Sequence, residues 1–435
     1  MLRDDHDRDQ DAAPAFRLDV HLHEQLTQPA DARSVLPPAR GPVSLPEPVF
    51  PRHPELLGDD GIDYEACARD AVEGHRRWTA AQVGRAMQGW ALPYLKSRLL
   101  PGDFHPLITY LFTEWKCNLD CDYCWAYDNH VKGMTEEVAR RSIDWLRGTT
   151  GRVLALMGGE VLLRPAFAHK VIDYATQRGF WVYLPTNGRL LRPDTIDRLA
   201  DAGVATVNLA VDAVDVRPGL PKALAPIRAN VDYLIRRQYR YGYTVFLNMC
   251  ITRANLDDVR QLTEIAHEHG IATDYHIVES PLTEQPHYHK LQDNGLFIRP
   301  EDFAAVDGLI DWLIDRQRDG YRMANSIERL AQMKAFMRGG LEAWNCRAGQ
   351  NSLIVRTDGT LAPCFPMYSS THDWGTIEQP RIDGPALAAM KTQCQPHCFS
   401  TLNHILAFAY NDARVIRWIA RQARAGFQGI RGNFE

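Results

Sequence analysis

The sequence predicts an α/β fold in which six strand–helix units form a curved parallel sheet. Apolar runs rich in β-branched and aromatic residues occur at 106–114, 152–157, 181–185, 205–211, 243–251 and 274–278. Amphipathic stretches separate them, at 136–147, 165–177, 193–202, 224–237 and 256–269. Parallel strands need long crossover connections, usually helices, and these stretches supply them. The regular spacing favours a partial (β/α)6 barrel of the TIM type, in which ligands gather at the carboxyl ends of the strands.

The remaining segments differ from the barrel in composition. Residues 1–50 are rich in Pro, Asp and Arg without periodicity and predict a mobile tail. Helical spacing within 51–105 predicts a helical extension, and two long helices after the sixth strand complete a barrel region at 106–340. Residues 341–400, rich in Gly, Pro and Cys, predict a small metal-stabilised module rather than more barrel. Residues 401–435 carry a final amphipathic helix.

Composition narrows the class of protein. The chain has 435 residues, a net charge of −5 and no apolar run of the roughly 20 residues that would span a bilayer. It has no basic field for nucleic acid and no secretory signal, which predicts a cytoplasmic protein. In that compartment nine cysteines are more typical of ligands than of disulfides. Cys67 and Cys250 stand alone and are interpreted as buried apolar residues.

Three cysteines, Cys117, Cys121 and Cys124, lie within eight residues just after the first strand. Three thiolates can hold three irons of a [4Fe–4S] cluster and leave the fourth iron open to a substrate or cofactor. The alternative is a zinc site. Zinc sites favour Cys-x2-Cys pairs with a fourth Cys or His, and His130 is the only His near this segment.

This Cys-x3-Cys-x2-Cys run resembles that of the radical S-adenosylmethionine (SAM) enzymes, over roughly residues 106–280. A second signature of that family, Met157-Gly158-Gly159-Glu160, stands at the end of the second strand. The resemblance implies that this segment binds the amino group of SAM, which chelates the open iron. It also implies reductive cleavage of SAM to a 5′-deoxyadenosyl radical that abstracts an unactivated hydrogen.

Further positions follow from the same resemblance. Tyr123 is expected to contact the adenine. The fourth strand departs from the family pattern, because Ala210 stands where a serine is usual, and Asn208 on the same face is the expected substitute. The full set of predicted SAM-binding residues is Tyr123, Gly158, Gly159, Glu160, Thr186, Asn187, Asn208 and Asn248.

A second cysteine set follows late in the chain, at Cys346, Cys364, Cys394 and Cys398. The Asp-Gly turn between two short apolar runs predicts a β-hairpin before Cys364. The spacing resembles the short single-cluster (twitch) form of the SPASM-type auxiliary modules, which implies one auxiliary [4Fe–4S] cluster. Four thiolate ligands would saturate the irons of this cluster, which favours a role in electron transfer. Three ligands would leave one iron open. Structural zinc is the alternative.

Catalytic candidates are Asp212 and Glu279 at strand ends and His287 in a polar loop, where each is able to bind a substrate hydroxyl or take a proton. Strand-end salt bridges and a solvated loop are the simpler interpretations. The final helix places Arg414, Arg417, Arg421 and Arg424 on one face, so weak contact with a membrane surface is a further possibility.

Together these features predict a radical SAM oxidoreductase or C–H-functionalising enzyme acting on a small molecule, with a low-potential donor such as flavodoxin or ferredoxin. Peptide maturases and lipid-modifying enzymes are the alternatives among enzymes. A non-catalytic iron–sulfur or zinc protein is the alternative of another class.

Overall fold

The computed structural model describes residues 57–73, 75, 78–124, 128–278, 282, 294–341 and 344–400, with positions 403, 404, 406, 407, 410, 414–417 and 420 near the C-terminus. The predicted mobile tail and most of the final helix lie outside these residues. None of the described helices is both long and apolar enough to cross a membrane.

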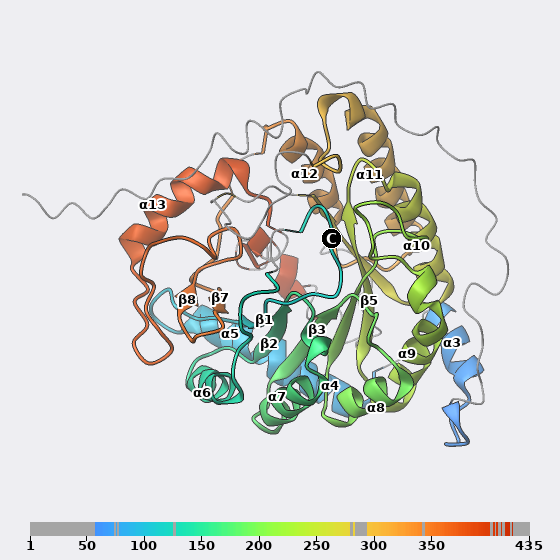
Figure 1. Ribbon diagram of the computed structural model, residues 1–435, viewed down its shortest axis with the longest axis horizontal. Coiled ribbons are helices and arrows are strands. Elements are labelled where there is room, and N and C mark those ends of the chain that lie inside the picture. Colours follow the sequence, from blue (N-terminus) through green and yellow to red (C-terminus); the bar gives the residue numbers. More distant parts are fainter. Residues whose placement is uncertain are drawn as a thin grey trace, which may run out of the picture.

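One eight-stranded sheet organises the described chain, in the order β6-β5-β4-β3-β2-β1-β7-β8 (Figure 1). Its strands are β1 (Ile108–Glu114), β2 (Val153–Gly158), β3 (Trp181–Thr186), β4 (Thr206–Ala210), β5 (Thr244–Ile251), β6 (Ala272–Ile277), β7 (Ser352–Val355) and β8 (Leu361–Ala362). All neighbouring pairs from β6 to β7 are parallel, and only β7 and β8 are antiparallel. The carboxyl ends of β1 to β6 therefore meet at one edge.

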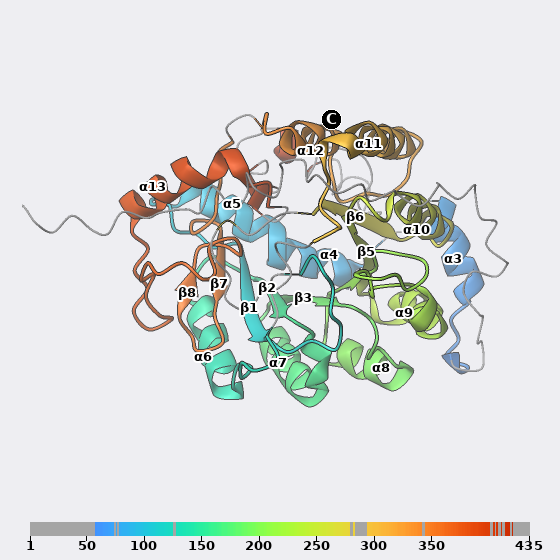
Figure 2. The same cartoon turned by 45° about the horizontal axis from the view of Figure 1, so that its top comes forward.

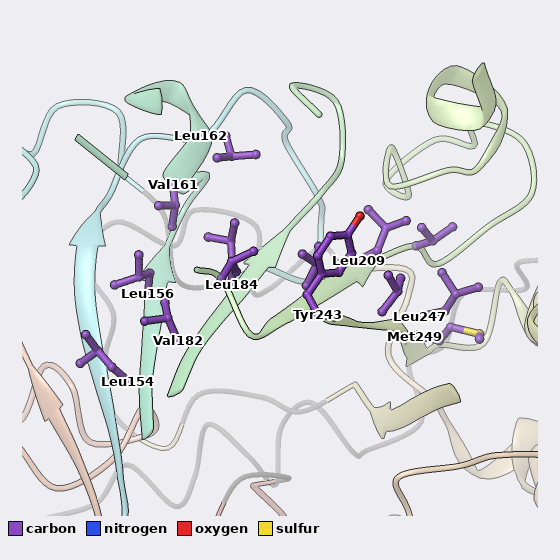
Figure 3. Close-up of a cluster of buried hydrophobic side chains, with 14 of the residues drawn as sticks. Leu154, Leu156, Val161, Leu162, Val182, Leu184, Leu209, Tyr243, Leu247 and Met249 are labelled. Carbon is purple, nitrogen blue, oxygen red and sulfur yellow. The ribbon is translucent and has the colours of Figure 1, made fainter. Parts of the chain in front are cut away.

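Helices cover the convex side of the curved sheet, because alternate strand residues on that side are apolar (Figure 1). Leu184, Leu209, Leu247 and Met249 belong to the resulting core (Figure 3). The crossover helices are α6 (Glu136–Arg147), α7 (Pro165–Gln177), α8 (Pro193–Asp201), α9 (Arg228–Tyr241) and α10 (Leu256–Glu268). The sheet remains open, which confirms the predicted partial barrel. Its concave side is called the lumen below.

The predicted late hairpin is present, but it is not separate from the barrel. β7 pairs with β1 in parallel, with Ile108 opposite Ser352, and β8 returns beside β7. This pairing covers the backbone groups that β1 would otherwise expose at the sheet edge. The hairpin thus adds to the edge of the barrel sheet, and the division of residues 341–400 into a module of their own stays a prediction. The module also contains α13 (Gly384–Cys394) and the 3-10 turn Gln395–His397.

The N-terminal extension closes the amino ends of the strands. It consists of α3 (Tyr64–Glu73), α4 (Ala80–Ala86), the π-helical turn Met87–Ala91 and α5 (Leu92–Leu99), and Figure 2 shows α4 and α5 crossing the sheet. Gly89 packs on Trp181 at the start of β3, where an added Cβ would lie 2.8 Å from the Trp181 Cβ. Gln82 donates to the Gly242 carbonyl at 3.0 Å, just before β5. The extension therefore lies opposite the edge where the cysteine loop begins.

Two helices follow β6, α11 (Phe303–Arg318) and α12 (Ile327–Met337). Asn325, just before α12, extends the outer edge of β6 with its side chain. Its amide accepts from the Tyr275 N–H and donates to the Tyr275 carbonyl, both at 2.8 Å. These two hydrogen bonds satisfy backbone groups at the sheet edge and fix α12 beside β6.

Candidate active site

The cysteine loop leaves the carboxyl end of β1 and is held by a buried carboxylate. Glu114 accepts hydrogen bonds from the Trp115 and Lys116 amides at 3.0 and 3.1 Å. The Asn129 side chain accepts from the Cys117 amide at 3.0 Å. These bonds fix the direction in which the first cysteine leaves the sheet. Sequence reasoning overlooked Glu114, although its place three residues before the first cysteine was a usable signal.

The Gly158–Gly159 pair lies directly against the start of this loop. The Gly159 and Glu160 amides donate to the carbonyls of Glu114 and Lys116 at 2.7 and 2.8 Å. A Cβ at Gly158 would lie 1.9 Å from the Glu114 carbonyl oxygen, and one at Gly159 would lie 2.3 Å from the Lys116 oxygen. Side chains at these two positions would push the loop away from β2, so both glycines are required for this close approach.

Glu160 is almost completely buried, with 1% of its surface exposed. Its carboxylate accepts from the Leu162 amide at 3.0 Å, the Thr186 hydroxyl at 2.9 Å and the Asn187 amide at 2.9 Å. Burial raises the pKa of Glu160, and these hydrogen bonds offset part of the effect. A carboxylate has about four acceptor positions, so one remains for a further donor.

Asn187 connects this carboxylate to the cysteine loop. Its side-chain amide donates to the Asn118 side chain at 2.8 Å, and its Nδ2 lies 4.0 Å from the Cys117 sulfur. The ends of β1, β2 and β3 are therefore joined by one hydrogen-bonded network. The structure thus brings together Cys117, Glu160, Thr186 and Asn187.

A second buried network joins the cysteine loop to the end of β4. The Tyr123 hydroxyl donates to the Asp212 carboxylate and accepts from the Lys222 ammonium at 2.8 Å. The other Asp212 oxygen accepts from the Cys250 amide at 2.8 Å. Each carboxylate oxygen of Asp212 thus accepts one hydrogen bond, which fixes the orientation of this side chain. The Tyr123 hydroxyl is occupied as well, so only its ring is left for contact with a base.

Lys222 was missed by sequence reasoning and carried no motif signal. Burial alone would lower its pKa, but the neighbouring Cys121 and Asp212 raise it above the ordinary value. Its charge in turn opposes the rise that burial causes in the pKa of Cys121. A fixed cation thus lies close enough to the cysteine loop to stabilise thiolates there.

The remaining predicted site residues divide into two groups. Asn208 and Asn248 face the lumen, where Asn208 donates to the Tyr183 hydroxyl. Asn248 makes no side-chain hydrogen bond to any described residue. Glu279 and His287 lie outside the described residues.

The three thiols of the loop fit a shared iron–sulfur cluster. Burial raises the pKa of Cys117 to about 11, and the nearby Cys124 adds to the rise. The thiolate form therefore needs a cationic partner, which a cluster iron supplies. Within the described residues, no three Cys, His, Asp or Glu side chains converge as a single metal ion requires. An iron–sulfur cluster distributes its irons, so its ligands need not converge on one point.

The second cysteine set is also brought together and buried. Cys346 and Cys394 both contribute to the raised pKa of Cys364, after burial itself, so the three thiols lie within electrostatic reach of one another. Cys398 packs with Cys394 in a small buried cluster. Lys391 donates to the Cys346 carbonyl at 2.8 Å, which places a buried ammonium beside this set. The donors therefore suit an anionic cluster.

Comparison with known proteins identifies the class to which this site belongs. Residues 116–278 match the family model of the Radical SAM superfamily. The matched segment begins at the cysteine loop and ends after β6, so it spans the network described above. Residues 116–278 therefore form a domain of the radical SAM superfamily. Members of this superfamily are enzymes that use SAM and a [4Fe–4S] cluster.

Two characterised relatives show how far the likeness extends. The chain is 26% identical over 271 residues to the AdoMet-dependent heme synthase of Methanosarcina barkeri. This alignment covers 57% of this chain and 73% of that protein. It is 32% identical over 173 residues to the S-adenosylmethionine-dependent nucleotide dehydratase of Selenomonas ruminantium, covering 36% and 60%. The crystal structure of Streptococcus suis SuiB bound to precursor peptide SuiA is similar with a TM-score of 0.51 and 15% identity, over 68% of this chain and 69% of that one. At that identity the likeness shows the fold alone.

Proposed function

We propose that the chain cleaves SAM reductively and uses the resulting radical to abstract hydrogen from an unactivated C–H bond of a small molecule. Cys117, Cys121 and Cys124 would hold the cluster. Glu160 would bind the amino group of SAM with its remaining acceptor position. When bound, the cluster supplies the electron that breaks SAM into methionine and a 5′-deoxyadenosyl radical.

One observation carries the proposal, the network that runs from Cys117 through Asn118 and Asn187 to Glu160. A purely structural metal site needs no buried carboxylate beside its first ligand. An amine-binding carboxylate fixed relative to a cluster ligand is what chelation of SAM at an open iron requires. The glycines at 158 and 159 support the same geometry, since they let β2 approach the loop.

The chain's own residues contribute position and charge. Lys222 offsets the negative charge of the three thiolates and of Asp212, while Tyr123 links that cation to the loop. Asn208 and Asn248 are assigned to SAM or substrate at the lumen side of the site. Glu279 and His287 remain candidates for contact with the substrate.

We further propose that Cys346, Cys364, Cys394 and Cys398 hold one auxiliary [4Fe–4S] cluster that takes up or delivers an electron. Their burial and the nearby Lys391 ammonium support an anionic cluster over an unfilled thiol group. Structural zinc is the competing assignment, and metal analysis separates the two.

A small-molecule substrate and a low-potential donor such as flavodoxin or ferredoxin complete the proposal. The likeness to SuiB bears on the fold alone, so it does not favour a peptide substrate. The lipid alternative depended on the arginine face of the last helix. There Arg414 pairs with Glu328 at 3.0 Å, and Arg421 and Arg424 lie outside the described residues.

The test is anaerobic reconstitution with iron and sulfide, followed by assay for 5′-deoxyadenosine from SAM and dithionite. We expect deoxyadenosine from the wild type, none from the Cys121→Ala variant, and an undiminished yield from the matched control Cys67→Ala, whose thiol lies on α3. Roughly eight irons per chain would support two four-iron clusters, and roughly four with zinc would refute the auxiliary cluster. Absence of deoxyadenosine from well-loaded wild type would refute the proposed activity.

A further inference from the structure

The lumen wall of β6 carries two ionisable side chains that no step above uses. Tyr275 and Ile277 point into the helix-side core, so Asp274 and His276 between them face the lumen. Asp274 lies opposite Asn248 of β5 in the sheet register. His276 lies about 7 Å further along the same face, toward the carboxyl end of β6. The cysteine loop leaves β1 at the same edge of the sheet.

Asp274 is 92% buried, and its Oδ1 has no hydrogen-bond partner among the described residues. An unpaired buried carboxylate oxygen is costly, and native proteins rarely keep one without a use. Burial raises the pKa of Asp274 to about 6, although the charge of Arg329 opposes the rise. A hydrogen-bond donor on a ligand would therefore satisfy the Oδ1 of Asp274.

The surroundings of this oxygen are partly accessible although they lie deep in the fold. Lumen-facing residues of β3 and β5 are half-buried, whereas their helix-facing neighbours are fully buried. Ionisable groups within electrostatic reach of Asp274 come from several elements, namely Tyr110 of β1, Tyr183 of β3 and Arg329 of α12. Aromatic walls with a few polar groups are typical of small-molecule sites.

We infer that Asp274 and His276 form a substrate-binding pair in the lumen and hydrogen-bond a hydroxyl group of a small-molecule substrate. This inference deepens the proposed function by naming a substrate class. Arg329 already supplies the counter-charge of Asp274, so a neutral donor suits the site better than a second cation. His276 makes no hydrogen bond to a described residue and, as a neutral imidazole, offers both a donor and an acceptor to a second hydroxyl.

The first test measures binding of simple probes to the reconstituted protein with SAM by ligand-observed NMR. The probes are cis-cyclopentane-1,2-diol and 1,2-dimethoxycyclopentane, which lacks hydroxyl donors. We expect the diol alone to bind, about tenfold more weakly to Asp274→Asn and not detectably to Asp274→Leu. The matched control Asp194→Asn, on α8, should bind the diol as the wild type does. Equal binding of both probes, no binding of the diol to the wild type, or unchanged affinity in Asp274→Asn would overturn the inference.

A second measurement needs no variant at this position. Carbodiimide labelling of carboxyl groups in the wild type, read by peptide mass spectrometry, should be slowed at Asp274 by the diol and unaffected at Asp194. Equal labelling with and without diol would count against the pair. Deoxyadenosine formation is measured in the same preparations without probe. Its absence refutes the proposed activity and leaves the binding result readable, because binding does not require SAM cleavage.

Discussion

Replacing Glu160 by glutamine tests whether this carboxylate binds the amine of SAM. In the wild type Glu160 Oε1 accepts two hydrogen bonds and Oε2 accepts one, from the Asn187 amide. In one orientation of the glutamine, its oxygen takes the place of Oε1 and keeps both hydrogen bonds made there. Its NH2 group then takes the place of Oε2 and faces the Asn187 N–H. The opposite orientation would lose two bonds. The better orientation therefore leaves one pair of buried donors facing each other.

The magnitude follows from that single lost bond and from the lost charge. One unsatisfied buried group costs about 1–3 kcal/mol of folding stability. A charge-assisted hydrogen bond to the SAM ammonium contributes about 1.5–3 kcal/mol, so the variant should bind SAM roughly 10- to 150-fold more weakly.

The assays are isothermal titration of reconstituted protein with SAM, and urea unfolding of the protein without SAM. The control is Glu137→Gln, whose side chain is 80% exposed on α6 and which should change neither quantity. If Glu160→Gln loses stability but binds SAM as tightly as the wild type, Glu160 is a structural anchor only, and its assignment to the amine is refuted.

Three further changes test other parts of the molecule. Cys364→Ala should lower the iron content from about eight to about four per chain, while Cys67→Ala leaves it unchanged; equal iron in both would contradict the auxiliary cluster. The pKa of Asp274 is about 6 in the folded protein, against an ordinary value of 3.8. Ionised Asp274 therefore destabilises the folded state by its full amount above about pH 6, and this cost is absent below about pH 4, where the carboxyl is protonated in both states. Asp274→Asn should therefore unfold at higher urea at pH 7, by up to about 3 kcal/mol, with the gain vanishing by pH 4; a gain independent of pH would reject this reasoning. Gly159→Ala places a Cβ 2.3 Å from a backbone oxygen of the cysteine loop and should abolish iron loading. Gly308→Ala in α11, which meets no atom within 4 Å, should load normally and gain up to about 1 kcal/mol.

The sequence predicted the barrel well because each strand and helix carries its own periodicity. Helices α6 and α7 begin and end at the predicted residues, and all six strands occur within two residues of their expected limits. The β7–β1 pairing was not predictable in the same way, since it depends on which sheet edge is free in three dimensions. The start of α9 was placed four residues early because a 3-10 turn, Ala225–Ile227, precedes it.

Site residues divide along a similar line. Cys117, Glu160 and Asn187 belong to spaced motifs, so the sequence alone made them candidates. The proposed roles of Lys222 and Asp274 depend on burial and long-range contacts, which leave no local pattern in the sequence. Lys222 comes close to the cysteines only because the segment after β4 folds back over the loop, where the Asp122 amide donates to the Gly219 carbonyl at 3.0 Å.

The pairing of β7 with β1 has a consequence for electron flow. Ile108, at the first residue of β1, lies opposite Ser352, and the return of β8 brings Cys364 to about this level. Cys117 lies just beyond the other end of β1, which is about 20 Å away at the usual rise of a strand. Both ends belong to one hydrogen-bonded sheet, so the segments that carry the two cysteine sets are attached to the same strand. If both sets hold clusters as proposed, the path of an electron between them would lie alongside one continuous sheet.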